Sequence, residues 1–337
     1  MTTGTAARNR ANAFETSPVE RILAQGGIVI ALVVIAVVGT ALMEPRFLNR
    51  LNITNLLRNV SFLALPSLAQ MLVMTTGGFD LSVGAVLAVS SVVTAMIMLV
   101  AGPMFPGMDL LVILMALGGA VSVGVAVGLV NGLLIARFGL SPFMVTLAVT
   151  SGLMGLALYY TQGIPIYGVL DSFSNGIGRG QVLGLPMVLA IALVVLAAII
   201  LLQRRTVLGR HIYAVGSDAR SARLSGVPVR RTLVVTYVMA SVLAAFAGFL
   251  MTSRLGSGQA TIGGTLALES IAAAVIGGVS LRGGVGRAEH VFMAALFLTV
   301  IANAMNLLQI DSKYQTLMLG AVLIGALSLE RLLLRKP

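Results

Sequence analysis

The stretch LGLPMVLAIALVVLAAIILL, residues 183–202, contains no charged side chain. A helix needs about 20 mainly apolar residues to cross the hydrocarbon core of a bilayer, and this stretch supplies them. It runs directly into QRRTVLGRHIYAVGSDARSARLSGVPVRR, residues 203–231, which we call the basic segment. This segment holds seven of the 22 basic residues of the chain and a single acid, Asp218. The pair predicts a membrane-crossing helix that ends on one polar face of the membrane.

The composition extends this prediction to most of the chain. Of the 337 residues, 58% are hydrophobic and only 10% are charged. Soluble domains carry about 25% charged residues, so the solvent of this chain is predicted to be lipid. We therefore expect an all-α, polytopic membrane protein. The 38 glycines suit helices that approach one another closely.

Several classes of function are excluded by what the sequence lacks. It has no cysteine, hence no disulfide or thiolate metal site, and no HExxH, GxSxG or GxxxxGK[ST] motif. We expect no catalytic residue, no metal site and no cofactor in this chain, so ATP and Mg would be bound by another subunit. The net charge of +11 does not indicate a nucleic-acid partner, because the basic residues lie at the ends of apolar segments and form no continuous face.

Ten apolar stretches predict about ten transmembrane helices, six before the basic segment and four after it. The eighth stretch is short, and whether it spans the membrane fully stays open. The expected divisions are an N-terminal tail (1–24), a first membrane half (25–202), the basic segment (203–231), a second membrane half (232–330) and a C-terminal tail (331–337). The predicted spans are 26–43, 59–76, 81–101, 110–136, 142–160, 183–202, 232–252, 266–279, 288–308 and 314–329.

The distribution of basic residues predicts the orientation. If the basic segment is cytoplasmic, both termini are cytoplasmic, and 16 of the 22 basic residues lie on that side. This bias agrees with the positive-inside rule. The exception is the stretch EPRFLNRLNITNLLRNV, residues 44–60, whose three arginines would lie on the other side. We interpret it as an amphipathic helix at the interface.

Each half contains a glycine-rich polar stretch beside an acid. The first is GGFDLSVG, residues 77–84, and the second is LESIAAAVIGGVSLRGGVG, residues 268–286. A charge at membrane depth is costly, so Asp80 either caps the third span together with Ser82 or takes part in the transport pathway. Glu269 is either an acid in a first helical turn or a cavity-facing or subunit-contact residue. The candidate pathway or structural residues are Gly77, Gly78, Asp80, Ser82, Glu269, Gly277 and Gly278.

Three blocks carry a resemblance to a known family. They are GGFDLSVGAVLAVSS (77–91), AVGSDARSARLSGVPVRR (214–231) and SRLGSGQATIGGTLALESIAAAVIGGVSLRGGVGR (253–287). In this order they closely resemble the permeases of ribose-, galactose- and xylose-type ATP-binding cassette (ABC) sugar importers, over roughly residues 52–329. A branched-chain amino acid ABC permease is the nearest alternative, and GGFDLSVG and IGGVSLRGG favour the sugar branch. A secondary transporter acting alone is a further alternative.

The resemblance implies a fold similar to the ten-helix, type II importers of vitamin B12. It implies a multi-pass protein of the bacterial inner membrane that translocates a monosaccharide or related polyol. The implied partners are a second permease subunit, identical or not, a tandem ATP-binding subunit and a periplasmic sugar-binding protein. The resemblance does not say which sugar is carried.

The resemblance also assigns a role to part of the basic segment. A short helix over residues 218–225, ending at Gly226, would dock in a groove of the ATPase. In that arrangement Ala219, Ala222 and Leu224 would face the groove, while Arg220 and Arg223 would face acidic residues. The plainer interpretation is a solvated loop that obeys the positive-inside rule. The candidate coupling residues are Asp218, Arg220, Ala222, Arg223, Leu224 and Gly226.

Overall fold

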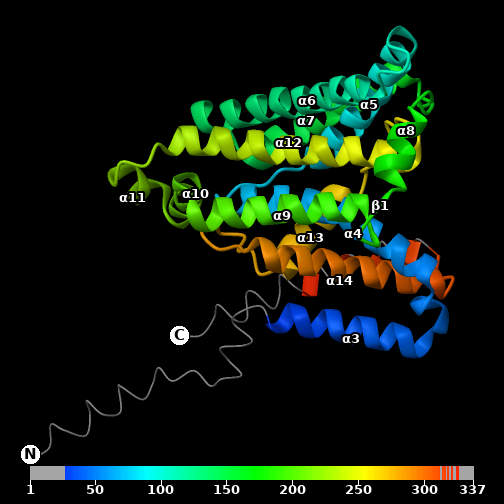
Figure 1. The fold of residues 1–337 in the computed structure, drawn as a ribbon. Coiled ribbons are helices and arrows are strands. Elements are labelled where there is room, and N and C mark those ends of the chain that lie inside the picture. Colours follow the sequence, from blue (N-terminus) through cyan, green and yellow to red (C-terminus); the bar gives the residue numbers. More distant parts are fainter. Residues whose placement is uncertain (1–26, 312, 316, 319, 322–323, 326–337) are drawn as a thin grey trace, which may run out of the picture.

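The computed structural model describes residues 27–311, 313–315, 317–318, 320–321 and 324–325. This part of the chain is almost entirely helical (Figure 1). The longer helices are α3 (Ile28–Met43), α4 (Arg50–Thr75), α5 (Val83–Met104), α6 (Asp109–Phe138), α7 (Pro142–Thr161), α9 (Met187–Arg205), α12 (Val229–Leu255), α13 (Leu266–Ile276) and α14 (Ala288–Leu307). The short elements are η3 (Pro45–Leu48), α8 (Asp171–Phe173), η4 (Ser174–Gly178), β1 (Gln181–Val182), β2 (Leu185–Pro186), α10 (Val207–Ser217) and α11 (Ala219–Leu224).

The all-α membrane architecture is confirmed. Seven helices in the described part of the chain are long and apolar enough to cross a membrane, and α3 and α13 are shorter apolar helices. The tenth predicted span, 314–329, lies partly outside the described residues, so the count of ten stays a prediction. Helix α13 has 11 residues, or roughly 16 Å at 1.5 Å per residue, about half of the hydrocarbon thickness.

The predicted interfacial helix over residues 44–60 is wrong. Only the single 3₁₀ turn η3 separates α3 from α4, and α4 begins already at Arg50. The Asn49 side chain accepts a hydrogen bond from the Leu51 amide at 2.9 Å and so caps α4. The span therefore starts nine residues before the apolar stretch does, because a good N-cap fixes the start of a helix independently of hydropathy.

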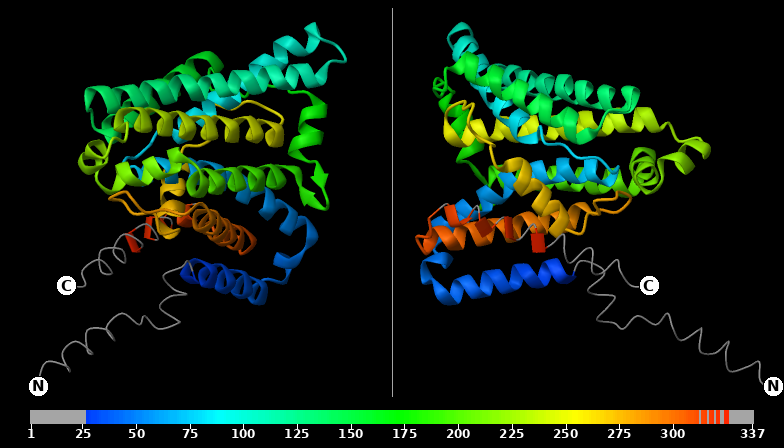
Figure 2. Two further views of the ribbon diagram at one scale, coloured as in Figure 1. Left: turned by 60° about the vertical axis from the view of Figure 1, so that its left-hand side comes forward. Right: turned by 180° about the vertical axis from the view of Figure 1, so that it is seen from behind.

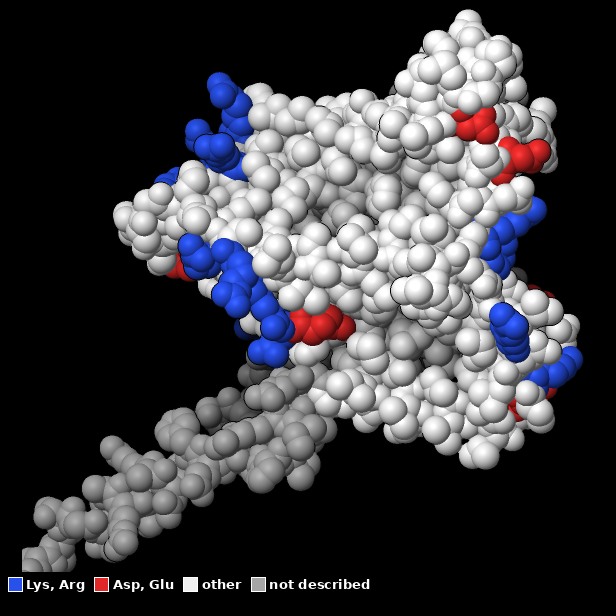
Figure 3. Space-filling model, in the orientation of Figure 1, with Lys and Arg blue, Asp and Glu red and all other residues white. Residues whose placement is uncertain are grey.

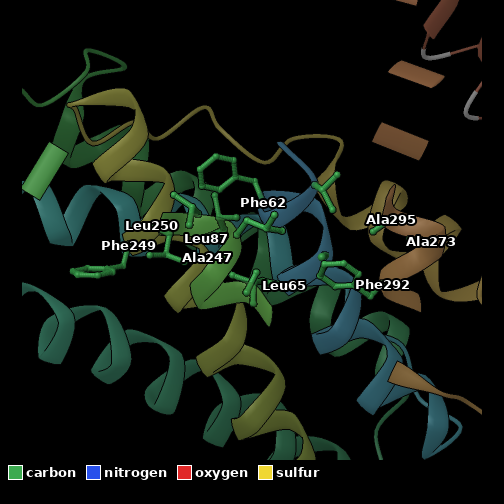
Figure 4. Close-up of a cluster of buried hydrophobic side chains, with 14 of the residues drawn as sticks. Phe62, Leu65, Leu87, Ala247, Phe249, Leu250, Ala273, Phe292 and Ala295 are labelled. Atoms are coloured by element: carbon green, nitrogen blue, oxygen red, sulfur yellow. The ribbon is translucent and has the colours of Figure 1, made fainter. Parts of the chain in front are cut away.

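The helices lie roughly side by side in layers, with α6 and α7 at one edge and α3 at the other (Figure 1). Helix α4 runs through the middle, and its second half is almost completely buried. Phe62 and Leu65 of α4 lie between Leu87 and Leu250 on one side and Phe292 on the other (Figure 4). This central helix joins residues from both halves of the chain into one apolar core.

A stripe of glycines brings α6 and α12 into close contact. A Cβ atom on Gly124, Gly128 or Gly132 would lie 2.7, 2.4 or 2.8 Å from a Cα atom of α12. These glycines recur every four residues and therefore share one face of α6. Small residues at such spacing let helix backbones approach in a membrane, as the glycine-rich composition predicts.

The chain turns back into the bundle between α12 and α13. Gly258 pairs with Ile166 through two backbone hydrogen bonds of 2.8 and 2.9 Å. The Gln259 amide donates to Ser91 Oγ of α5 at 3.3 Å, and Gly263 packs against Gly84 at the start of α5. Helix α13 begins after this return, and its buried residues start at Ser270.

Helices α10 and α11 project beyond the ends of the longer helices, at the same end in all three ribbon views (Figures 1 and 2). On the face shown in Figure 3, Lys and Arg gather at this end and again at the opposite end. The surface between the two ends carries no charged side chain in that view. Such an uncharged band between charged rims is what a bilayer requires.

Candidate coupling face and solute cleft

Helix α11 lies within the range predicted for a short helix in the basic segment. Asp218 is its N-cap: the carboxylate accepts from the Arg220 amide at 2.9 Å and from the Ser221 hydroxyl at 2.5 Å. These two hydrogen bonds, the hydroxyl first, hold the pKa of the Asp218 carboxyl below its usual range. Gly226 follows the helix with φ +82°, a left-handed conformation that favours glycine. Cap and glycine together fix both ends of α11.

The side chains of α11 divide differently from the prediction. Arg220, Arg223 and Leu224 are exposed, and Leu224 shows 83% of its surface to solvent although it is apolar. The expectation that Ala222 faces outward is wrong. Ala222 is buried against Val215 and Val229 in a small apolar cluster. It attaches α11 to α10 and α12, and the exposed residues of α11 are Ala219, Arg220, Ser221, Arg223 and Leu224.

The GGFDLS segment forms a tight turn inside the protein between α4 and α5. Gly77 has φ +82°, and a Cβ atom on Gly78 would lie 2.5 Å from the Tyr237 hydroxyl oxygen. Tyr237 donates to the Phe79 carbonyl oxygen at 3.2 Å, and the Leu81 amide donates to Thr146 Oγ1 at 3.1 Å. Side chains from α7 and α12 therefore hold this turn.

Asp80 is fully buried in this turn. Its Oδ1 atom accepts from the Ser82 amide at 2.8 Å and from Ser82 Oγ at 2.5 Å. The Asn131 amide of α6 donates to Ser82 Oγ at 2.9 Å. Asp80 thus satisfies an amide at the start of α5, as predicted, but the expected capping by Ser82 is wrong, because Ser82 makes no side-chain cap. Its hydroxyl instead links Asp80 to α6.

The second glycine-rich stretch lies against the first. Gly277 ends α13, and a Cβ atom there would lie 2.8 Å from the Val291 Cα atom of α14. Gly278 has φ +78°, and its amide donates to the Val275 carbonyl oxygen at 2.9 Å. Further along the stretch, the Gly284 amide donates to the carbonyl oxygen of Thr75, just before the GGFDLS turn, at 2.9 Å. The sequence shows two similar stretches, and the structure brings them together.

Glu269 lies in the first turn of α13, where it accepts a hydrogen bond from Thr265 Oγ1 at 2.7 Å. It also lines a cleft of ≈ 780 Å³ between α4, α12, α13 and α14, which we call the polar cleft. This volume exceeds that of a monosaccharide and is of the size typical of small-molecule sites. The lining includes eight polar residues: Asn59, Arg254, Thr265, Glu269, Thr299, Asn303, Asn306 and Gln315.

Three arginines meet beside this cleft. Arg58 donates to the Arg179 carbonyl oxygen at 2.9 Å, and both Arg58 and Arg254 approach Asn55 Oδ1, at 3.5 and 3.3 Å. The ion pairs found among the described residues involve other groups. We call Arg58, Arg179 and Arg254 the arginine cluster. It concentrates positive charge at the end opposite α11.

Several of these residues carry no signal that sequence reasoning could use. The arginine cluster comes from three distant segments, and its members were counted only for orientation. Asn131 and Asn303 are recognisable as polar residues within apolar spans, but their partners are not. Among the described residues, no group of three His, Cys, Asp or Glu side chains could hold a metal ion.

A bundle of membrane-length helices with a capped basic helix at one end and a polar cleft near the other defines a membrane transport subunit. The chain belongs to the family described as "Branched-chain amino acid transport system / permease component", which it matches over residues 52–327. No solved structure matches the chain.

Curated relatives identify the branch of this family. The chain is 41% identical to the ribose import permease protein RbsC of Bacillus subtilis (strain 168), over 88% of this chain and 90% of the relative. It is 34% identical to the D-allose transport system permease protein AlsC of Escherichia coli (strain K12), over 91% of each chain. It is 32% identical to the galactose/methyl galactoside import permease protein MglC of the same strain, over 92% and 95%. The predicted membership among sugar-importer permeases is confirmed.

Proposed function

We propose that the chain is the membrane-spanning permease subunit of an ABC importer and translocates a monosaccharide. The observation that carries this proposal is the 41% identity to a ribose import permease over about nine tenths of both chains. The polar cleft adds chemical support, because amide, hydroxyl and carboxylate groups are the partners that sugar hydroxyls require. The bulk of selection would then rest with the protein that delivers the sugar.

The orientation follows from the two charged ends. The end with α10 and α11 is cytoplasmic, both termini lie on that side, and the membrane is the bacterial inner membrane. With residues 314–329 as the last span, the chain has ten helices in the type II arrangement. The cytoplasmic excess of arginine in the basic segment supports this assignment.

The energy comes from a separate tandem ATPase, which binds ATP and Mg and grips α11. Arg220, Arg223 and Leu224 offer it two charges and one apolar side chain on a helix whose ends are fixed. A second permease subunit, identical or related, completes the transporter. Movement of α11 during ATP binding and hydrolysis shifts the equilibrium between two alternative packing arrangements of the membrane helices.

A periplasmic binding protein delivers the sugar at the opposite end. The arginine cluster there favours a partner that presents acidic side chains. Arg254 belongs both to this cluster and to the lining of the polar cleft. A partner seated on the cluster would therefore release its sugar directly above the cleft.

The test is uptake by proteoliposomes that contain this chain, its cognate ATPase and its binding protein. ATP inside the vesicles should drive accumulation of labelled ribose, allose or galactose, and vesicles with this chain alone should accumulate none. Labelled leucine tests the branched-chain amino acid alternative, which the family description names. Uptake of leucine without sugar, or ATP-independent uptake by the chain alone, would overturn the proposal.

A further inference from the structure

Three backbone segments meet at the end of α10, two residues before the Asp218 cap of α11. They are the end of α4 with its turn (75–78), the end of α10 (216–217) and the loop between α13 and α14 (280–286). The Gly284 amide donates to the Thr75 carbonyl oxygen at 2.9 Å, which joins the two glycine-rich stretches. The end of α10 lies against both. We call this meeting point, formed by Thr75, Gly77, Gly216, Gly283 and Gly284, the glycine junction.

The junction leaves no room for a side chain at position 216, in the last turn of α10. A Cβ atom on Gly216 would lie 1.8 Å from the Thr75 carbonyl oxygen and 2.6 Å from the Gly284 amide nitrogen. A Cβ atom on Gly283 would lie 2.7 Å from the Gly216 carbonyl oxygen and 2.8 Å from the Gly77 amide nitrogen. All of these neighbours are backbone atoms, which cannot move aside as a flexible side chain can. The three segments are therefore in direct backbone contact.

A side-chain clamp reinforces the same contact. Tyr213 of α10 donates to the Gly286 carbonyl oxygen at 2.5 Å, and Gln203 at the end of α9 donates to the Tyr213 hydroxyl at 2.8 Å. The Gln203 side-chain oxygen accepts from the Ala288 amide at 3.1 Å, at the start of α14. The clamp thus fastens α9 and α10 to the loop that leads into α14.

Only one residue lies between Gly216 and Asp218, the cap of α11. A displacement of α11 consequently reaches the junction without passing through a flexible linker. From the junction, the displacement can be transmitted to the membrane helices through two sets of contacts. The GGFDLS turn connects to α5, α6, α7 and α12 through Asp80, Ser82, Thr146 and Tyr237, and the loop 280–286 connects to α13 and α14.

We propose that α10, α11 and the two glycine-rich loops form one rigid block, and that Gly216 is the positioning residue that holds the block together. Resting on the proposed function, this inference says how a pull on one short helix reaches both halves of the chain at once. With a looser contact, α11 could move without displacing one of the two membrane halves of the chain.

The first test measures the block itself. Since the chain has no cysteine, spin labels can be placed on Ser225→Cys and Val285→Cys, both exposed positions. In the complete transporter, their separation is measured without nucleotide and with ATP plus vanadate. A rigid block predicts the same separation in both states. A change of the mean separation in a labelled transporter that still takes up sugar overturns the proposal.

The second test measures coupling. Gly216→Ala should lower the sugar transported per ATP hydrolysed by about tenfold, a size typical of coupling between sites, while the ATPase still co-purifies because the exposed face of α11 is unchanged. The matched control is Gly118→Ala, a helical glycine with nothing within 4 Å, which should leave the ratio unchanged. An unchanged ratio in Gly216→Ala overturns the proposal.

If Gly216→Ala does not fold, Tyr213→Phe loosens the clamp with almost no change of volume and should lower the same ratio, and the label distances decide independently. Absence of ATP-driven uptake by the unmodified transporter is a different result. It would overturn the proposed function, and the inference with it.

Discussion

The Asp80 side chain shows how a single buried residue can organise a turn at membrane depth. Its Oδ1 atom receives both hydrogen bonds that Ser82 can direct to it, and Ser82 in turn receives one from Asn131. Burying polar groups without partners is costly, and these bonds satisfy Asp80 Oδ1 and Ser82 Oγ, while Asp80 Oδ2 and Asn131 Oδ1 are buried without a partner. The turn they hold also lies beside the glycine junction.

Two substitutions of Asp80 distinguish its role as a hydrogen-bond acceptor from the role of its negative charge. Asp80→Ala leaves the buried Ser82 amide and hydroxyl without their acceptor, at a cost of about 1–3 kcal/mol each. Asp80→Asn keeps an oxygen at the Oδ1 position and should fold nearly as well as the unmodified chain. Thermal unfolding of the purified permease in detergent measures both. Asp171→Ala, at an exposed acid, is the control and should stay within about 0.5 kcal/mol.

Uptake by Asp80→Asn then tests the second interpretation of this residue. A folded variant that transports poorly would show that the carboxylate acts in the pathway. Normal uptake would leave Asp80 as the organiser of the turn alone.

At the scale of single residues, the sequence indicated which side chains matter better than where they point. The helical range around Asp218–Gly226 and the acids Asp80 and Glu269 could be recognised from charge, glycine and apolar context. The orientation of Ala222 could not, since it depends on how α11 folds against Val215 of α10 and Val229 of α12. The bond from Asn131 to Ser82 could not either, since it joins residues 49 positions apart.

Among the elements, the pair α6 and α12 depends most visibly on residue size. A Cβ atom on Gly128 would lie 2.4 Å from the Val238 Cα atom, so Gly128→Ala must push the two helices apart. Overpacking of this kind costs about 1–3 kcal/mol, and the thermal unfolding temperature should fall accordingly. Gly118→Ala on the same helix has free space and should be neutral. Equal effects of the two variants would contradict the close contact.

The cap of α11 makes a second prediction at this scale. Asp218→Ala removes the acceptor for the Arg220 amide and should reduce ATP-driven uptake several-fold, whereas Asp218→Ser keeps a capping oxygen and should retain most of it. Uptake in proteoliposomes at neutral pH measures the difference. Equal loss in both variants would mean that the charge of Asp218, rather than its cap, is what the partner requires.

The same cap has a defined pH dependence. Because the folded pKa of Asp218 lies below its unfolded value, its stabilising effect is complete above the unfolded pKa and is lost as the pH falls through the folded pKa. Capping of α11 should therefore be constant between pH 6 and 8, a window that lies above the ordinary range of a carboxyl, about 3.9. Backbone amide exchange of α11 across this window, compared in the unmodified chain and Asp218→Ser, checks the expectation; protection that varied in the unmodified chain alone would contradict it.

For the whole molecule, the charge at the two ends predicts how partners are distinguished. Arg179→Glu should weaken association with the binding protein and reduce its salt dependence, because a rim charge mainly affects electrostatic attraction. Arg137→Glu makes the same charge change at the C-terminal end of α6, which the proposed orientation places on the side of the basic segment, and should leave that association unchanged. Binding to the permease in nanodiscs at two salt concentrations provides the measurement. A larger effect of Arg137→Glu would reverse the assigned orientation.

The overall architecture was largely predictable because lipid imposes simple rules on sequence. Apolar length located nine of the described helices, whereas the orientation predicted from charge asymmetry stays a prediction. The start of α4 at Arg50, the return of residues 256–265 into the bundle and the β1–β2 hairpin were not predictable in this way. The first depends on the Asn49 cap, the second on packing against α5, and the third on a turn with positive φ at Leu183 and Gly184, none of which hydropathy reports.

Helix α3 has a consequence for how the protein is made. Among the described residues it packs chiefly on α14, through Val29, Val33, Ala36 and Thr40, at the outer edge of the bundle (Figure 2). About 240 residues separate the two helices, so at 5–20 residues per second a ribosome needs roughly 10–50 s to synthesise the partner of α3. Helix α3 is therefore in the membrane before α14 is available to pack against it. Its sequence IVIALVVIAVVGTALM contains no charged residue, so its surface can contact lipid until α14 is inserted.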